Sequence, residues 1–254
     1  MKQKKASIES QLGGTLCDVE DTEEMFWMRQ SDDYQSKVAL GNALSAQYRF
    51  HEAVEQFRNA LQIKSDDPSL YLRLGGAYLT VRNFKASYDA YMRCLELEGN
   101  DKSVAYPLGV WNYLRGEYST AAEWFAKCLP CGDELAIAVI YWHCLCGLRS
   151  DSHLELLKQY HPDMKVGHHT AYRAAVSLFS GETDRKAMFA ALENEQDDLN
   201  YVIAAYGLYV YLFVSGEKEK SDSLLKDILS RKAVWPCISY LAAWNDAYGQ
   251  THSE

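Results

Sequence analysis

The chain has 254 residues and an acidic composition, with a formal net charge of −9. A basic face is the electrostatic footprint of nucleic-acid binding, so this charge argues against a nucleic-acid partner. The one basic run, around Lys4 and Lys5, precedes polar residues where an export signal needs an apolar stretch. With seven cysteines, an odd number, and no such signal, we expect reduced thiols and a cytoplasmic protein.

Two apolar runs, 135–148 and 201–214, raise the question of membrane insertion. A helix that spans the hydrocarbon core needs about 20 residues, and both runs are shorter. We therefore expect two buried helices and no insertion into a membrane.

Residues 1–33 form an N-terminal arm that precedes the repeats described below. A glycine pair at 13–14 ends the first helical segment, and Thr22 is a candidate N-cap because Glu23 and Glu24 follow it. The next four side chains, at 25–28, are Met, Phe, Trp and Met, which are too many apolar groups for a solvated tail. We expect them to dock on the first hairpin or on a second copy of the chain, which leaves a homodimer through the arm open.

Residues 34–130 are organised by a period of 34 residues. Gly41, Gly75 and Gly109 are separated by that interval, and a leucine precedes each of them. Aromatic and small residues recur in the same register: Phe50, Phe84 and Tyr118; Ala53, Ser87 and Ala121; Phe57, Tyr91 and Phe125; and Ala60, Cys94 and Cys128. Small residues let two helices approach closely, and the aromatic rings fill the space between hairpins. Since one helical hairpin cannot bury its apolar face alone, the three repeats are expected to stack.

This combination of an early Leu-Gly pair, a central small residue and an aromatic residue four positions later resembles the tetratricopeptide repeat (TPR). The resemblance implies an all-α fold, a right-handed superhelix of stacked helical hairpins with a concave and a convex side. It also implies a non-catalytic module that binds protein or peptide partners.

Proline and glycine mark the ends of the repeat helices. Pro68 stands at a first-turn position, where its missing N–H has little cost, and Gly99 fits the position after a helix end. Pro107 lies directly before the third Leu-Gly pair, where it bends the helix unless it falls in the first turn.

Beyond residue 130 the repeat consensus is lost, but helix lengths and turns continue. We expect degenerate TPR-like hairpins over 131–232, with helices at 134–148, 153–160, 168–179, 184–193, 201–214 and 219–230. Trp235-Pro236 then opens a last helix that reaches about Tyr248, so 233–254 is interpreted as a capping helix with a tail.

The TPR resemblance also places a candidate binding site. In this family the concave wall is lined by first-helix residues at set offsets around the Leu-Gly pair. Those offsets select the candidate peptide-groove residues Val38, Asn42, Leu72, Leu79, Tyr106, Val110 and Tyr113. Such an apolar, aromatic trough suits an extended segment with hydrophobic anchors. The alternative is that some of these side chains pack against neighbouring helices.

One well-known binding mode of TPR proteins does not fit these residues. The clamp that TPR co-chaperones use for the C-terminal carboxylate of a chaperone needs Lys, Asn and Arg side chains. Asn42 matches, but the other positions hold Val38, Arg73, Ser103 and Pro107. A carboxylate clamp is therefore not expected.

The arm is similar to that of class II chaperones of bacterial type III secretion, which keep translocator proteins soluble before export. The likeness rests on Gly13-Gly14-Thr15-Leu16, on the helix start at Thr22, and on the proline before the third Leu-Gly pair. The second half of the chain has no counterpart in those chaperones, and the spacing from Thr15 to Ala53 is several residues longer.

No residue pattern indicates catalysis, a metal or a cofactor. Phosphate-binding glycine loops and the common hydrolase motifs are absent from the sequence. Cys128, Cys131, Cys144 and Cys146 superficially resemble a zinc set. However, the last two would point about 200° apart on a helix, so we expect buried small side chains and no metal. The histidines at 161, 168 and 169 are expected in a solvated loop.

The sequence thus predicts a non-catalytic protein-interaction module that binds an extended hydrophobic segment of a partner in its concave groove. A type III secretion translocator chaperone is the sharpest form of this prediction. The alternative is a scaffold or assembly subunit that acts through its convex face or its N-terminal arm.

Overall fold

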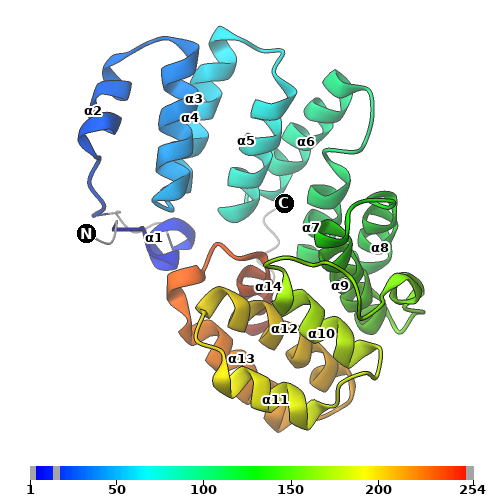
Figure 1. The fold of residues 1–254 in the computed structure, drawn as a ribbon. Coiled ribbons are helices and arrows are strands. Elements are labelled where there is room, and N and C mark those ends of the chain that lie inside the picture. The colour runs from blue at the N-terminus through cyan, green and yellow to red at the C-terminus, as the bar shows by residue number, and fades with distance from the viewer. Residues whose placement is uncertain (1–3, 14–17, 250–254) are drawn as a thin grey trace. The chain divides into compact units, whose positions relative to one another are not determined.

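The computed structural model describes residues 4–13 and 18–249, and every regular element in these ranges is helical (Figure 1). Contacts divide the chain into two compact units, with the boundary between Pro107 and Leu108. Unit 1 holds the arm and the first two repeats, and unit 2 holds most of the third repeat and the degenerate hairpins. Gly14, Thr15 and Leu16 of the arm motif, and the tail from residue 250, lie outside the described residues.

Unit 1 consists of two short arm helices followed by two helical hairpins. The arm helices are α1 (Ile8–Leu12) and α2 (Glu23–Gln30). The hairpins are α3 (Tyr34–Ala46) with α4 (Phe50–Ile63), and α5 (Pro68–Thr80) with α6 (Phe84–Glu98). The helix α7 (Ala105–Leu114) begins in unit 1 and continues into unit 2.

The predicted signals for helix ends are confirmed. The side chain of Thr22 accepts a hydrogen bond of 3.3 Å from the backbone N–H of Met25 at the start of α2. Pro68 is the first residue of α5, and Gly99 follows α6 in the left-handed conformation, with φ of 69°. Pro107 is the third residue of α7, so it lies in the first turn, where no intrahelical N–H bond is lost.

The 34-residue spacing corresponds to one close contact that recurs in each regular repeat. A Cβ atom added to the repeat glycine would lie 2.4 Å from Phe57 at Gly41, 2.4 Å from Tyr91 at Gly75 and 2.7 Å from Phe125 at Gly109. A real Cβ atom does not come so close to a ring, so the glycine permits the approach of the two helices. The all-α array of stacked hairpins predicted from the sequence is confirmed within unit 1.

The arm docks on the first hairpin through both of its helices. The N–H of Ala6, just before α1, donates a 2.8 Å hydrogen bond to the carbonyl of Gln47, at the turn between α3 and α4. Met25 of α2 is only 2% exposed and joins the hydrophobic cluster that contains Leu40 and Phe57. The methionines of α2 thus dock on the first hairpin, which is one of the two arrangements expected from the sequence.

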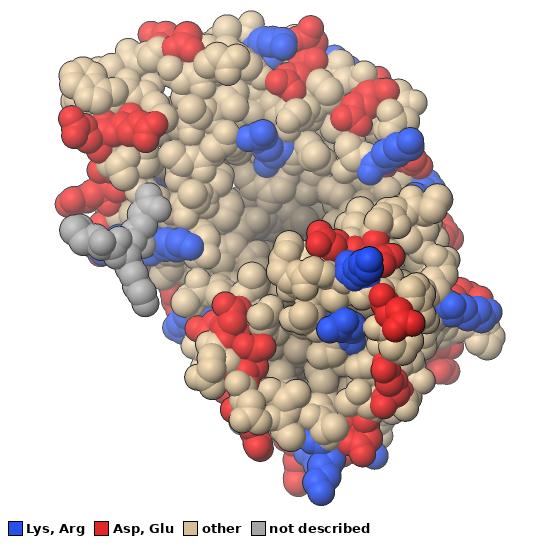
Figure 2. Space-filling view, in the orientation of Figure 1, with Lys and Arg blue, Asp and Glu red and all other residues tan. Residues whose placement is uncertain are grey.

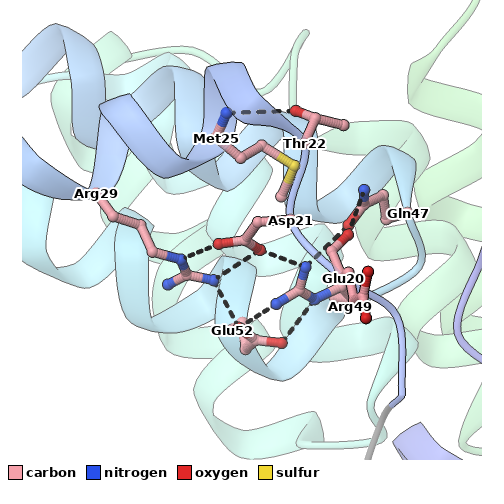
Figure 3. Close-up of polar contacts among 8 residues, drawn as sticks. All are labelled: Glu20, Asp21, Thr22, Met25, Arg29, Gln47, Arg49 and Glu52. Carbon is pink, nitrogen blue, oxygen red and sulfur yellow. Dashed lines mark hydrogen bonds and ion pairs between the residues drawn. The ribbon is translucent and has the colours of Figure 1, made fainter.

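An ion-pair network holds α2 against the first hairpin (Figure 3). Arg49, whose side chain is 8% exposed, donates to Asp21 at 2.5 Å and forms two bonds of 2.7 Å to Glu52. Arg29 of α2 pairs with the same two carboxylates, reaching Glu52 at 2.8 Å. Gln47 completes the network, since its side-chain oxygen accepts a 2.9 Å bond from Arg49.

Unit 2 continues with helices of less regular length. After α7 come α8 (Tyr118–Lys127), α9 (Asp133–Ser150), the 3-10 helix η1 (Glu155–Gln159), α10 (Thr170–Phe179) and α11 (Arg185–Asn194). The chain ends with α12 (Asp198–Val214), α13 (Lys218–Ser230), the 3-10 helix η2 (Lys232–Val234) and α14 (Ile238–Tyr248). The helix expected at 153–160 is therefore a 3-10 turn, and the predicted last helix, α14, packs on α12 and α13.

The core of unit 2 is built around α9 and α12, the two apolar runs of the sequence. Both helices are buried over most of their length, and α12 contacts α9, α10, α13 and α14. Burial of apolar surface from all sides explains why these segments lack an amphipathic pattern. No helix of the described ranges combines the length and apolar character needed to cross a membrane.

The paired glycines of α5 test the contact that defines the repeat. Gly75→Ala should destabilise the protein by about 1 to 3 kcal/mol, because the added methyl meets the buried ring of Tyr91. Gly76→Ala is the matched control, since its nearest neighbour would be the Tyr91 hydroxyl at 3.9 Å. That change should be neutral or stabilising by up to about 1 kcal/mol, because alanine favours helix. Urea unfolding measures the free energy of unfolding of both variants. Equal effects of the two substitutions would contradict a role for the contact between Gly75 and Tyr91.

The arm network predicts loss of stability in acid. The hydrogen bond from Arg29 lowers the pKa of Asp21 below its ordinary 3.8. Burial opposes ionisation of Glu52, but bonds from Arg49 and Arg29 hold its pKa below 4.5. Because both folded-state values are lowered, this stabilisation is present at neutral pH and is lost as the pH falls through them.

Asp21→Asn isolates this effect. At about pH 6 the variant should be less stable than the parent by about 1 to 3 kcal/mol, because two arginines lose a charged acceptor. The difference should shrink below about pH 4, where the parent carboxylates also become protonated. Urea unfolding of both proteins across this range is the measurement, and a difference independent of pH would argue against the network.

Candidate functional site

In unit 1, four of the predicted groove residues lie on the first helices of the two hairpins, and three of them remain partly accessible. Val38 and Asn42 are on α3, Leu72 is on α5, and all three are half-buried. A hydrogen bond of 2.8 Å from the guanidinium of Arg73 to the side-chain oxygen of Asn42 joins the two helices. We refer to Val38, Asn42, Leu72 and Arg73 as the α3–α5 face.

The α3–α5 face presents donors as well as apolar groups. Arg73 is exposed, and its bond to Asn42 uses one of its five N–H groups. Among the described residues, neither side chain forms another hydrogen bond. The amide nitrogen of Asn42 and the remaining guanidinium N–H groups are thus free to meet acceptors. Val38 and Leu72 add aliphatic surface of the kind that an apolar anchor contacts.

Sequence reasoning did not anticipate the role of Arg73. The offsets taken from the family pointed to Asn42 and Leu72, and Arg73 was weighed only as a failed clamp position. The sequence signal for Arg73 was its position directly after the predicted groove residue Leu72, where the preceding repeat has Ala39. Contact across two helices depends on side-chain direction, which spacing within one helix does not fix.

Three of the predicted groove residues are buried. Leu79, Val110 and Tyr113 are 3%, 2% and 3% exposed, so they belong to the core and not to an open wall. Tyr106, in the first turn of α7, is half-buried. The groove predicted for the third repeat is therefore corrected at Val110 and Tyr113, and that of the second repeat at Leu79.

The physical reason is clearest for Tyr113. Its ring packs edge-on against Trp142 of α9, with centroids 4.9 Å apart, and its hydroxyl lies 3.0 Å from that of Tyr206 of α12. Burial raises the pKa of Tyr113 well above its ordinary value. The side-chain amide of Asn245, on α14, donates a 3.0 Å bond to the carbonyl of Leu114. In unit 2 the chain's own α12 and α14 thus cover the face of α7.

A buried polar cluster secures this arrangement. Arg149 of α9 pairs with Asp246 of α14, and Arg149 also donates to the Tyr206 hydroxyl at 3.1 Å. The Tyr206 hydroxyl in turn donates to Asp246 at 3.1 Å. Burial raises the pKa of Asp246, against the opposing effect of Arg149. Arg149 stands at the end of the apolar run of α9, and Asp246 is the one charged residue of α14. These two charges were the sequence signal for the pair, since buried charges occur in partnership.

The cysteines and histidines considered for metal binding do not converge. Cys144 and Cys146 are buried in α9, and burial raises the pKa of Cys144 to about 12. The Nδ1 of His169 donates a 2.5 Å hydrogen bond to the carbonyl of Glu134, while His161 and His168 are exposed. Within residues 4–13 and 18–249, no three His, Cys, Asp or Glu side chains gather as a metal site would require.

Unit 2 contains a cavity of about 660 Å³ between α11, the start of α12 and α13. Its floor is apolar, with Phe189, Leu192 and Leu224, and its rim contains charged groups. Two of these charged groups have partners: Arg231 pairs with Asp198 at 2.7 Å, and Asp227 accepts from the hydroxyl of Tyr201. The cavity therefore combines apolar side chains with charged groups that are partly paired within unit 2.

Comparison with known proteins identifies the repeats. Residues 41–81 match a family model for the TPR repeat, and residues 68–101 match a model for the tetratricopeptide repeat. No curated protein matches the chain. The chain is similar to the crystal structure of YrrB, described as a TPR protein with an unusual peptide-binding site. The identity is 14%, the match covers 89% of this chain and 98% of that one, and the TM-score is 0.45.

The two matched models span α4, α5 and α6 completely and the last part of α3, and they include Asn42, Leu72 and Arg73. Stacked repeats of this kind are protein-interaction modules, and they bind through the extended surfaces that stacking creates. Residues 41–101 are therefore tetratricopeptide repeats and form such a module.

Proposed function

We propose that the chain binds an extended segment of a partner protein on the α3–α5 face, without catalysis. The observation that supports this most directly is the bond between Asn42 and Arg73, which joins the first helices of two consecutive repeats. The matched repeat models include both residues of this bond and cover α5 and the last part of α3. A ligand lying across both helices contacts Val38 from one repeat and Leu72 from the next.

The residues of the face indicate what such a segment must offer. An extended chain has carbonyl groups without internal partners, and these accept hydrogen bonds from the Asn42 amide and the Arg73 guanidinium. Aliphatic or aromatic side chains of the segment cover Val38 and Leu72, with Tyr106 one repeat further along. The combination favours an apolar segment held by its main chain over a free carboxylate.

Two narrower roles follow from the arm. A chaperone that keeps a secretion translocator soluble is supported by the sequence likeness quoted above and by a capped α2 that docks on the first hairpin. A scaffold that acts through the arm is supported by the exposure of Phe26 and Trp27, at 53% and 64%. Both roles use unit 1, and they differ in which side of it meets the partner.

Capture from an extract of the native host, with mass spectrometry, tests the proposed face. Leu72→Asp should reduce recovery of the specific partner by at least about tenfold, because it places a charge where an apolar anchor rests. Asn42→Ala should reduce recovery less, since it removes one hydrogen-bonding group. Circular dichroism checks that the helices remain.

The matched control is Ile63→Asp, which places the same charge on α4 at a residue that is 52% exposed. Recovery should not change with this variant. If Leu72→Asp still captures the partner and Ile63→Asp does not, the binding surface lies elsewhere in unit 1.

A further inference from the structure

The outer side of α2 is unusual for a helix at the end of a stacked array. Terminal elements of repeat proteins need a polar outer face, because no further repeat covers them. Here Phe26 and Trp27 are 53% and 64% exposed, and their rings meet edge-to-face with centroids 5.5 Å apart. Met25 and Met28 already supply the contacts with the hairpin. Exposed aromatic surface of this kind marks an interaction site.

Carboxylates surround the exposed indole. Glu23 and Glu24 precede Trp27 by four and three positions, so all three side chains share one side of the helix. Together with Thr22, Met25 and Ala43 of α3, they line a surface pocket of about 540 Å³. Figure 2 shows acidic side chains gathered over α2, at the upper left of the molecule. We refer to Glu23, Glu24, Phe26 and Trp27 as the α2 patch.

In the part of the arm that the structure describes, no basic side chain pairs with these carboxylates. Arg29 is engaged by Asp21 and Glu52 in the network that docks α2. Glu23 and Glu24 are exposed and form no ion pair among the described residues. The α2 patch thus combines aromatic surface with unpaired negative charge, which favours a ligand that is apolar and cationic together.

A second copy of the chain fits this surface poorly. In a twofold dimer the same patch meets itself, so Glu23 and Glu24 would face their own equivalents. Like charges in an interface oppose association, and the whole chain has a net charge of −9. A basic partner meets no such opposition.

We propose that the α2 patch binds a basic amphipathic segment of a partner protein. Lysine or arginine side chains of that segment pair with Glu23 and Glu24 and lie against the face of Trp27, while its apolar side chains cover Phe26. The proposal is independent of the α3–α5 face, which lies on other helices of unit 1.

The probe is a fluorescein-labelled peptide of leucine and lysine at amphipathic helical spacing, compared with the same peptide in which glutamate replaces lysine. Fluorescence anisotropy should show binding of the lysine peptide only. Trp27→Ala should weaken it about tenfold. The double change Glu23→Gln and Glu24→Gln should weaken it about fivefold and flatten its dependence on salt. Leu72→Asp should leave it unchanged.

A second measurement locates the peptide. The chain has six tryptophans, and the indole N–H resonance that disappears in Trp27→Phe identifies Trp27. That resonance should shift during titration, and the other five should remain in place. Glu55→Gln and Ile63→Ala are matched controls, as an exposed carboxylate and an exposed apolar residue on α4.

Three outcomes would overturn the proposal. One is unchanged binding of the lysine peptide by Trp27→Ala and by the double glutamine variant. Another is equal binding of the lysine and glutamate peptides. The third is a dimer in sedimentation equilibrium that Trp27→Ala converts to a monomer, which would assign the patch to a second copy of the chain.

Discussion

The contact between a glycine on the first helix of a repeat and an aromatic ring on the second determines the geometry of the regular repeats. At Gly41, Gly75 and Gly109 the ring occupies the space where a Cβ atom would stand. The helices of each hairpin are thereby held at one separation, and successive hairpins of unit 1 stack in register. The bond between Asn42 and Arg73 depends on that register, because the two residues come from different repeats.

Much of unit 1 could be predicted from the sequence because its signals are local and periodic. The 34-residue spacing indicated the hairpins, and Thr22, Pro68 and Gly99 indicated where individual helices begin and end. Docking of the arm was also predictable, since four consecutive apolar residues require a packing partner. The sequence did not reveal which of the four would face outward. That depends on the ion-pair network of Asp21, Arg29, Arg49 and Glu52, which brings together residues from distant positions.

The candidate site was predictable only in part. Offsets from the Leu-Gly pair selected Asn42 and Leu72, which remain accessible on the α3–α5 face, but they also selected Val110 and Tyr113, which are core residues. For these two residues the reason lies in unit 2, where α12 and α14 cover α7, whereas Leu79 is buried within unit 1. An offset rule assumes that each first helix faces an open groove. This assumption fails for α7. The helix α12 is apolar on all sides and must be enclosed by other helices, so it packs where the open groove was expected.

The arm and the α3–α5 face divide the surface of unit 1 between two kinds of chemistry. The face combines aliphatic groups with hydrogen-bond donors, and the α2 patch combines aromatic rings with carboxylates. The central claim is that the α3–α5 face holds the partner segment. Hydrogen exchange of the captured complex tests it most directly. We expect slower exchange in peptides covering 34–46 and 68–80 and no change over 198–230. Protection confined to 198–230, with α3 and α5 unchanged, would contradict the claim.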